Sequence, residues 1–143
     1  MQFGSIIPCS KRMLSCWKSI SSIIFIFVIS SMPGKSIPDI PIWNFDKLIH
    51  CFIYFWLTFI VFLDLTRTAA WISSQTALLF SFMFSISYGG TLEILQRTVF
   101  INRSGDWIDL SANTLGAVFA IAVLPYINER IKGKKKSIKV DIH

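Results

Sequence analysis

Four long apolar runs, separated by short polar segments, constrain this 143-residue chain more than any other feature of its sequence. A bilayer core about 30 Å thick takes roughly 20 apolar residues per helix, so the chain can cross a membrane about four times. Hydrophobic residues make up 53% of the sequence and charged residues 15%, which is too apolar for a soluble protein. We predict one all-α membrane domain over residues 1–143, with helices over about 14–32, 46–65, 70–96 and 107–127.

The first apolar run has two interpretations. It follows Lys11, Arg12 and Lys18 and ends before Pro33 and Gly34, which stop a helix. A basic segment followed by an apolar run is also typical of a cleaved signal peptide. No small-x-small cleavage site precedes Pro33, and the segments behind it are also hydrophobic. We therefore predict that the first helix is retained.

The net charge of +6 is concentrated near the two ends of the chain. No nucleic-acid recognition motif accompanies it, so we predict no nucleic-acid partner. With four crossings, ten of the 14 Lys and Arg residues fall on the side of the termini. The positive-inside rule then places both ends in the cytoplasm, with residues 128–143 as a basic tail of a multi-pass protein of the cytoplasmic membrane. Membrane lipids are its expected partners, because such a tail attracts anionic headgroups.

The unusual polar residues converge on the outer leaflet in this topology. They come from three separate stretches of the sequence, at the start of the second helix, the end of the third and the start of the fourth. Polar side chains at such depth are costly when they face lipid, so we expect them to face one another or a wet cavity. We therefore predict a binding site made of Asp46, Lys47, His50, Tyr88, Glu93, Gln96, Arg103, Asp106, Asp109 and Asn113.

The spacing of these residues supports a shared site. Asp46 and His50 are four apart, and so share one helix face. Two further stripes repeat every three or four residues and are polar at their outer end: Ser85, Gly89, Glu93 and Gln96 on the third helix, and Asp106, Asp109, Asn113, Gly116 and Ala120 on the fourth.

Each of these residues also has a simpler structural interpretation. Asp46 and Asp106 could cap helix N-termini, and His50 could be an interfacial or packing histidine. Asn113 and Gln96 could form hydrogen bonds between helices. The His and carboxylates could bind a divalent metal, but the chain lacks an HExxH motif, so we predict no metal and no other cofactor.

Three motifs in order resemble those of the VanZ-like membrane proteins, a family named for a determinant of resistance to the glycopeptide teicoplanin. Residues 42–50 hold an Asp-Lys pair before a His, 87–96 a Tyr-Gly before a Glu and a Gln, and 103–116 an Arg-Ser-Gly-Asp segment leading to an Asn. The resemblance covers about residues 38–120. It implies a role in the cell envelope, with glycopeptide tolerance as one form of that role, and it implies no particular mechanism.

Three classes of function compete. We favour a non-enzymatic envelope protein whose polar pocket binds a lipid, a glycopeptide or a membrane-protein partner, with Lys47 and Arg103 available for phosphate or carboxylate groups. The alternative is an intramembrane enzyme that uses His50, Glu93 and Asp109 as acid and base on a lipid-linked envelope precursor. A transporter is disfavoured, because the polar residues stop in one leaflet and the sequence shows no inverted repeat.

Overall fold

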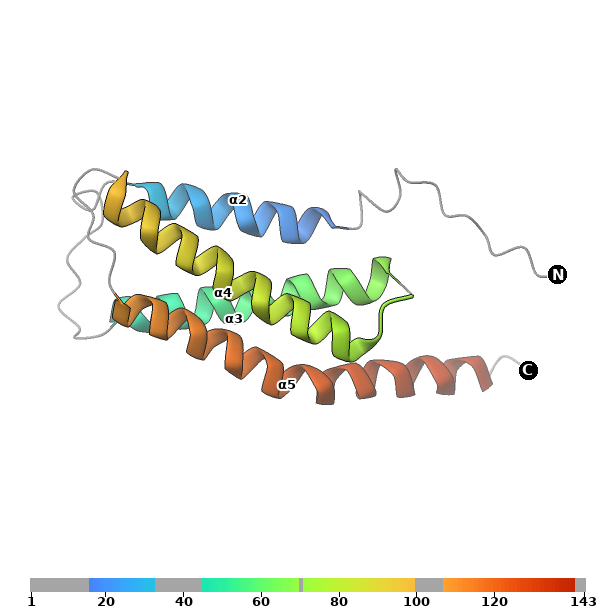
Figure 1. Cartoon of the computed structure of the whole chain (residues 1–143). Helices are drawn as coiled ribbons and strands as arrows, with labels where there is room; N and C mark the ends of the chain where they lie inside the picture. Colours follow the sequence, from blue (N-terminus) through green and yellow to red (C-terminus); the bar gives the residue numbers. More distant parts are fainter. Residues whose placement is uncertain (1–15, 33–44, 70, 100–106, 141–143) are drawn as a thin grey trace.

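The computed structural model describes residues 16–32, 45–69, 71–99 and 107–140, with side chains as far as Glu129. This part of the chain forms four helices: α2 (Trp17–Ser31), α3 (Phe45–Thr68), α4 (Ser74–Thr98) and α5 (Trp107–Val140). Successive helices run in opposite directions, so the start of α2 and the end of α5 lie at the same end of the bundle (Figure 1). Residues 33–44 and 100–106, which connect α2 to α3 and α4 to α5, lie outside the described residues.

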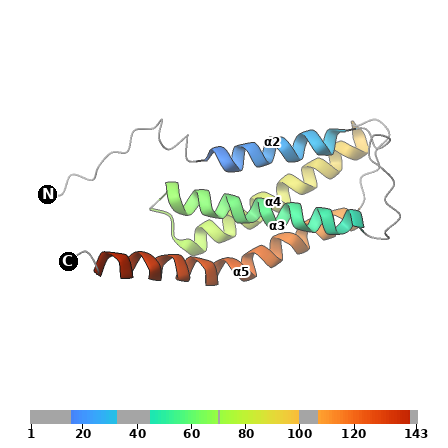
Figure 2. The same ribbon diagram turned by 180° about the vertical axis from the view of Figure 1, so that it is seen from behind.

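The helices α3 and α4 form the centre of the bundle. Each of them contacts all the other helices, whereas α2 and α5 lie on opposite sides and do not touch (Figures 1 and 2). Because α4 runs back between them in the chain, α3 and α5 are parallel. We name the end where α3 and α5 begin the Lys47 end, and the opposite end, where α3 finishes, the Asp64 end.

Three helices are long and apolar enough to cross a membrane: α3, α4 and the part of α5 over Trp107–Glu129. The apolar helix α2 is shorter, at 15 residues. Large hydrophobic side chains are exposed on all four helices, as expected of surfaces that face lipid. These features confirm the predicted all-α architecture for the described residues and indicate a membrane protein.

The helix ends differ from those expected from the sequence. The turn between α3 and α4 lies later, because α3 continues to Thr68 and α4 begins only after Ser73, whose side chain accepts a hydrogen bond from the Thr76 N–H. The fourth helix does not end near residue 127 but continues to Val140. Its direction changes in its middle third (Figure 1), where Pro125 lacks the N–H needed for the helical hydrogen bond.

A close approach between the backbones of α3 and α5 occurs at Gly116. A Cβ atom added there would overlap the carbonyl group of Cys51, with the carbonyl carbon at 2.8 Å and the Phe55 nitrogen at 2.9 Å. Small buried residues, Ala112, Ala117 and Ala120, continue this face of α5. Small side chains let helices approach closely in a membrane, where the apolar surface is not driven together by water.

The two predicted stripes are buried. On α4, the residues Ser85, Gly89, Glu93 and Gln96 all lie inside the bundle. On α5, the same holds for Asp109, Asn113, Gly116 and Ala120, while Asp106 lies outside the described residues. The 3.6-residue period therefore identified correctly which faces of these helices pack inward.

The helix α2 is held by polar side chains that contact its backbone. The buried carboxylate of Asp64 accepts hydrogen bonds from the Ser19 N–H at 3.0 Å and the Ser19 hydroxyl at 2.6 Å. The residue before α2, Cys16, makes no such cap, so Asp64 caps this helix from α3. Further along, the Tyr88 hydroxyl donates to the Ile23 carbonyl at 2.7 Å.

We predict that Gly116→Ala destabilises the protein, whereas Gly90→Ala does not. The added methyl at position 116 would force α3 and α5 apart, at a cost of about 1–3 kcal/mol. At Gly90 the nearest atom, Leu110 Cδ1, would be 4.0 Å away, and alanine favours the helix by about 0.5–1 kcal/mol. Unfolding of both variants in detergent, followed by circular dichroism, measures the difference. Equal stabilities would contradict the close approach.

Candidate functional site

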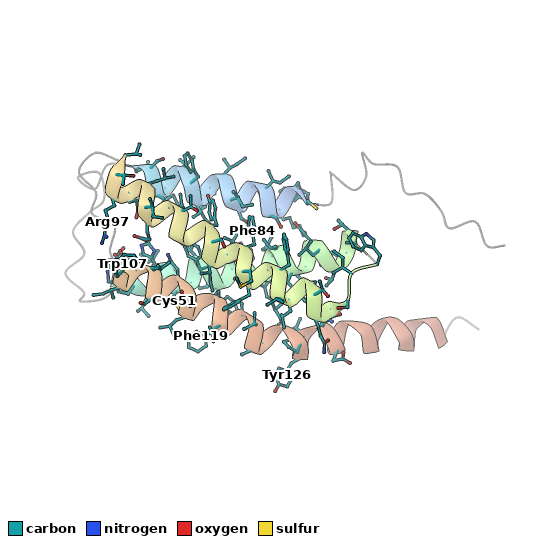
Figure 3. All side chains as sticks on the ribbon, in the orientation of Figure 1. Cys51, Phe84, Arg97, Trp107, Phe119 and Tyr126 are labelled. Carbon is teal, nitrogen blue, oxygen red and sulfur yellow. The ribbon has the colours of Figure 1, made fainter. Side chains whose placement is uncertain are left out.

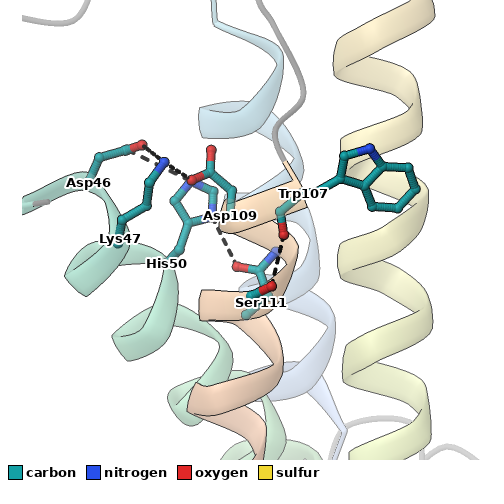
Figure 4. Close-up of polar contacts among 7 residues, drawn as sticks. Asp46, Lys47, His50, Trp107, Asp109 and Ser111 are labelled. Carbon is teal, nitrogen blue, oxygen red and sulfur yellow. Dashed lines mark hydrogen bonds and ion pairs between the residues drawn. The ribbon is translucent and has the colours of Figure 1, made fainter.

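A cluster of polar side chains joins α3 to α5 at the Lys47 end (Figure 4). Its members, which we call the Lys47 cluster, are Asp46, Lys47, His50, Asp109 and Asn113. The Lys47 ammonium donates to Asp109 Oδ1, forming an ion pair between the two helices. Lys47 is partly buried and Asp109 is buried. Because both charges are largely removed from solvent, loss of either partner would leave an uncompensated charge in the bundle.

The third charged member, Asp46, lies at the outer edge of the cluster. Its side chain is 64% exposed, and its carboxylate oxygens lie 3.6 Å from Lys47 Nζ and 3.8 Å from His50 Nε2. Asp46 is in the first turn of α3, where the helix dipole favours a negative charge. Asp46 is the second residue of α3, whereas an N-cap residue precedes the first helical residue, so this position brings Asp46 into the cluster and does not make it the N-cap.

The deepest contact of the cluster joins His50 to Asn113. His50 Nδ1 lies 2.9 Å from Asn113 Oδ1, and Asn113 is 1% exposed. An amide oxygen can only accept a hydrogen bond, so Nδ1 of His50 carries the hydrogen. The second ring nitrogen, Nε2, faces Asp46 and the outer opening of the cluster.

The amide nitrogen of Asn113 lies where α3, α4 and α5 meet. A Cβ atom added to Gly89 of α4 would lie 3.2 Å from Asn113 Nδ2 and 2.9 Å from the Tyr54 ring of α3. Among the described residues, Nδ2 has no hydrogen-bond partner. Glu93, one turn from Gly89 on α4, is buried within electrostatic range of Tyr54. The junction therefore connects the Lys47 cluster to the polar stripe of α4.

Two of the predicted site residues contact α2 instead of the Lys47 cluster. The Tyr88 hydroxyl donates to Ile23, and Gln96 Nε2 donates to the Ser30 carbonyl at 3.2 Å. Both contacts join α4 to the backbone of α2. The interhelical hydrogen bond considered for Gln96 is therefore present, whereas the one considered for Asn113 is formed with His50.

The remaining predicted residues, Arg103 and Asp106, lie outside the described residues. Nearby, the Arg97 guanidinium lies over the Trp107 ring, 5.1 Å from its centroid, and joins the end of α4 to the start of α5 (Figure 3). Such a cation–π contact is worth about 0.5–1 kcal/mol at an exposed site. This contact therefore joins the ends of two helices at the Lys47 end.

An apolar groove of about 490 Å³ lies on the surface of α3 and α5, the two helices that form the Lys47 cluster. Cys51 and Phe119 are two of its lining residues and are labelled in Figure 3. Leu48, which follows Lys47 in the chain, is another. Among the described residues, the lining is Leu48, Cys51, Phe52, Phe55 and Phe119.

One buried charge, Asp64, was not among the predicted site residues. It lies inside α3, near the helix C-terminus, where the helix dipole disfavours a negative charge. An acidic residue near a helix C-terminus, after a long apolar run, indicates that its carboxylate has a partner on another helix. Its partner is the N-terminus of α2, so its role at the Asp64 end is structural.

We predict that the Lys47–Asp109 pair stabilises the protein more than the Lys47–Asp46 pair does. A double-mutant cycle with alanine at positions 47 and 109 should give a coupling of about 1 kcal/mol or more. The matched cycle at positions 47 and 46 should give at most about 0.5 kcal/mol, because Asp46 is mostly exposed. Unfolding free energies in detergent provide both values. A larger coupling to Asp46 would refute the described geometry.

Comparison of the chain with protein-family models, curated proteins and solved structures finds no match. The resemblance to VanZ-like proteins therefore stays a prediction that depends on three sequence motifs. The first and third of these motifs contain the five residues of the Lys47 cluster. Any function of the cluster has to be argued from its own geometry.

Proposed function

We propose that this chain is a VanZ-like protein of the cell envelope that binds a lipid at the Lys47 end. The observation that carries the proposal is the apolar groove on α3 and α5, the same two helices that form the Lys47 cluster. A lipid combines an apolar chain with a polar headgroup, and the two parts of this surface have the same arrangement. The groove accommodates part of the lipid's apolar chain, and the cluster contacts the lipid headgroup.

The headgroup class follows from the donors in the cluster. Lys47 offers an ammonium group that pairs with Asp109, and its side chain is partly exposed. An ammonium group binds phosphate as a point charge. We therefore propose a lipid with a phosphate headgroup, which includes lipid-linked precursors of the envelope. A glycopeptide or a protein partner is the alternative occupant.

A catalytic function is the second candidate. His50 and Asp109 both belong to the Lys47 cluster, and together with Asp46 they bring an imidazole and two carboxylates within 4.8 Å of one another, groups that can act as general acid and base. Glu93, the third proposed catalytic residue, lies on α4 near Tyr54. This arrangement supports His50 and Asp109 as the acid–base pair, with Glu93 less directly involved.

We predict that Leu48→Gln weakens lipid binding about tenfold, whereas Leu79→Gln leaves it unchanged. The two leucines are matched, with 66% and 63% exposure, but only Leu48 lines the groove. Loss of one apolar contact worth about 1.4 kcal/mol corresponds to a factor of ten. Native mass spectrometry of the purified chain with phosphatidylglycerol, a polyprenyl phosphate and teicoplanin measures the binding.

The same measurement includes Lys47→Gln, which should weaken binding of both phosphate lipids. Binding of teicoplanin alone, sensitive to Lys47→Gln but not to Leu48→Gln, would replace the lipid with the glycopeptide. Equal effects of the two leucine substitutions would refute the groove as the binding surface. Binding that Lys47→Gln leaves unchanged would refute the cluster as the headgroup site.

We also propose that the chain crosses the cytoplasmic membrane four times with both ends inside. The distribution of Lys and Arg supports this topology, and the parallel course of α3 and α5 is compatible with it. We predict that green fluorescent protein fused to either end is fluorescent, and that alkaline phosphatase fused at the same positions is inactive. Active phosphatase at the C-terminus would place the Lys47 end in the cytoplasm.

A further inference from the structure

We propose that the Lys47 cluster is a binding site for a divalent transition metal, with Zn²⁺ as the best-fitting ion. The ligands are Asp46, His50 and Asp109, each of which offers one donor atom, and these three atoms lie within 4.8 Å of one another. This inference goes beyond lipid binding and does not depend on it.

One of the distances is close to that expected around a single ion, and a rotation of Asp46 would shorten the others. Two ligand atoms about 2.1 Å from a tetrahedral ion lie roughly 3.4 Å apart. Asp46 Oδ1 and His50 Nε2, four residues apart on one face of α3, are separated by 3.8 Å. Asp109 approaches from α5, and the exposed side chain of Asp46 can rotate to shorten the remaining distances.

The orientation of His50 favours metal binding. Since Nδ1 donates to the buried amide oxygen of Asn113, the lone pair of the neutral ring is on Nε2. Nε2 is the nitrogen that faces the carboxylate of Asp46. A cation between these two acceptors would be a ligand partner for both. A hydrogen bond to the second ring nitrogen is also how proteins orient the histidine ligands of metals.

A cation already lies between the two carboxylates. The Lys47 ammonium contacts Asp109 and lies 3.6 Å from Asp46. Its position shows that the cluster stabilises positive charge there, and a metal ion would displace it from both carboxylates. Lys47 is therefore a competitor of the ion, and its removal should strengthen metal binding.

The donor set determines the class of ion. One imidazole nitrogen with two carboxylate oxygens is suited to Zn²⁺, whereas Mg²⁺ prefers oxygen ligands alone. Three protein ligands would leave a coordination position open toward the exposed side of Asp46. The HExxH motif supplies two histidine ligands four residues apart on one helix. Here Asp46 and His50 have the same spacing, and Asp109 supplies the third ligand from a second helix.

The test measures Zn²⁺ affinity of the purified full chain in detergent, without an affinity tag, by competition with a chromophoric chelator. We expect one Zn²⁺ per chain, with affinity at least tenfold lower in Asp46→Asn and His50→Ala and higher in Lys47→Met. The matched controls are Glu129→Gln, at an exposed carboxylate of α5, and His143→Ala, at the other histidine of the chain; both should stay within twofold. Mg²⁺ should not compete at equal concentration.

Asp46→Asn still tests the site if other variants fail to fold, because the Asp46 side chain is mostly exposed and its substitution should leave folding intact. Circular dichroism checks the helix content of each variant. No Zn²⁺ binding by the unmodified chain, or affinity unchanged in both Asp46→Asn and His50→Ala, would overturn the site. Weaker binding in Lys47→Met would overturn the competition between the ammonium and the ion. The assay contains no lipid, so its failure would leave the lipid proposal standing.

Discussion

The geometry of the Lys47 cluster depends on the contact between the backbones of α3 and α5 at Gly116. Because these helices are parallel, one close contact brings their residues together at a nearly constant offset toward the Lys47 end. His50 meets Asn113 about one turn beyond the contact, and Lys47 meets Asp109 one turn further. A side chain at position 116 would separate the helices, and both polar contacts would then lengthen together.

The attachment of α2 follows a different principle. Side chains of α3 and α4 bind its backbone, at the Ser19 N–H and at the carbonyls of Ile23 and Ser30. Such bonds hold a helix in place while its large apolar side chains, including Ile24 and Phe25, face outward. Hydrogen bonds between helices contribute about 0.6 kcal/mol on average in membranes. Several of them are needed to fix a helix as short as α2, and none belongs to the Lys47 cluster.

The sequence could predict which faces are buried, but not which neighbour each face meets. On α4, Gly89 and Gln96 are seven residues apart and lie on nearly the same line along the helix, whereas Tyr88 lies about 100° from Gly89. Gly89 faces α3 and α5, but Gln96, two turns further along the same line, contacts α2, as Tyr88 does. All of these positions are polar or small, so periodicity alone joined them into one predicted site. The rotation of a helix is set by packing, which requires the positions of its neighbours.

The same reasoning applies to residues whose roles the sequence left open. Asp46 was equally compatible with a cap and with a binding site, and His50 with a packing residue and with a ligand. The partner of His50 on α5 is Asn113, 63 positions later in the chain, and Asp46 is linked to α5 through Lys47, whose partner Asp109 lies 62 positions later. No local pattern specifies such a pairing. Asp64 is a similar case, because its partner, Ser19, lies 45 positions earlier in the chain.

The depth of each residue divides the Lys47 cluster into a fixed part and an adaptable part. Asn113 is buried among three helices and holds the His50 ring in one orientation, so the inner part is rigid. Asp46 and Lys47 lie at the outer edge, where water can replace their mutual contact at little cost. A site that exchanges one cation for another needs both parts, because the rigid ligand sets the geometry and the adaptable ones admit the ion. Placing this combination at a helix end, and not at mid-membrane, also lowers the cost of the charges when Lys47 withdraws.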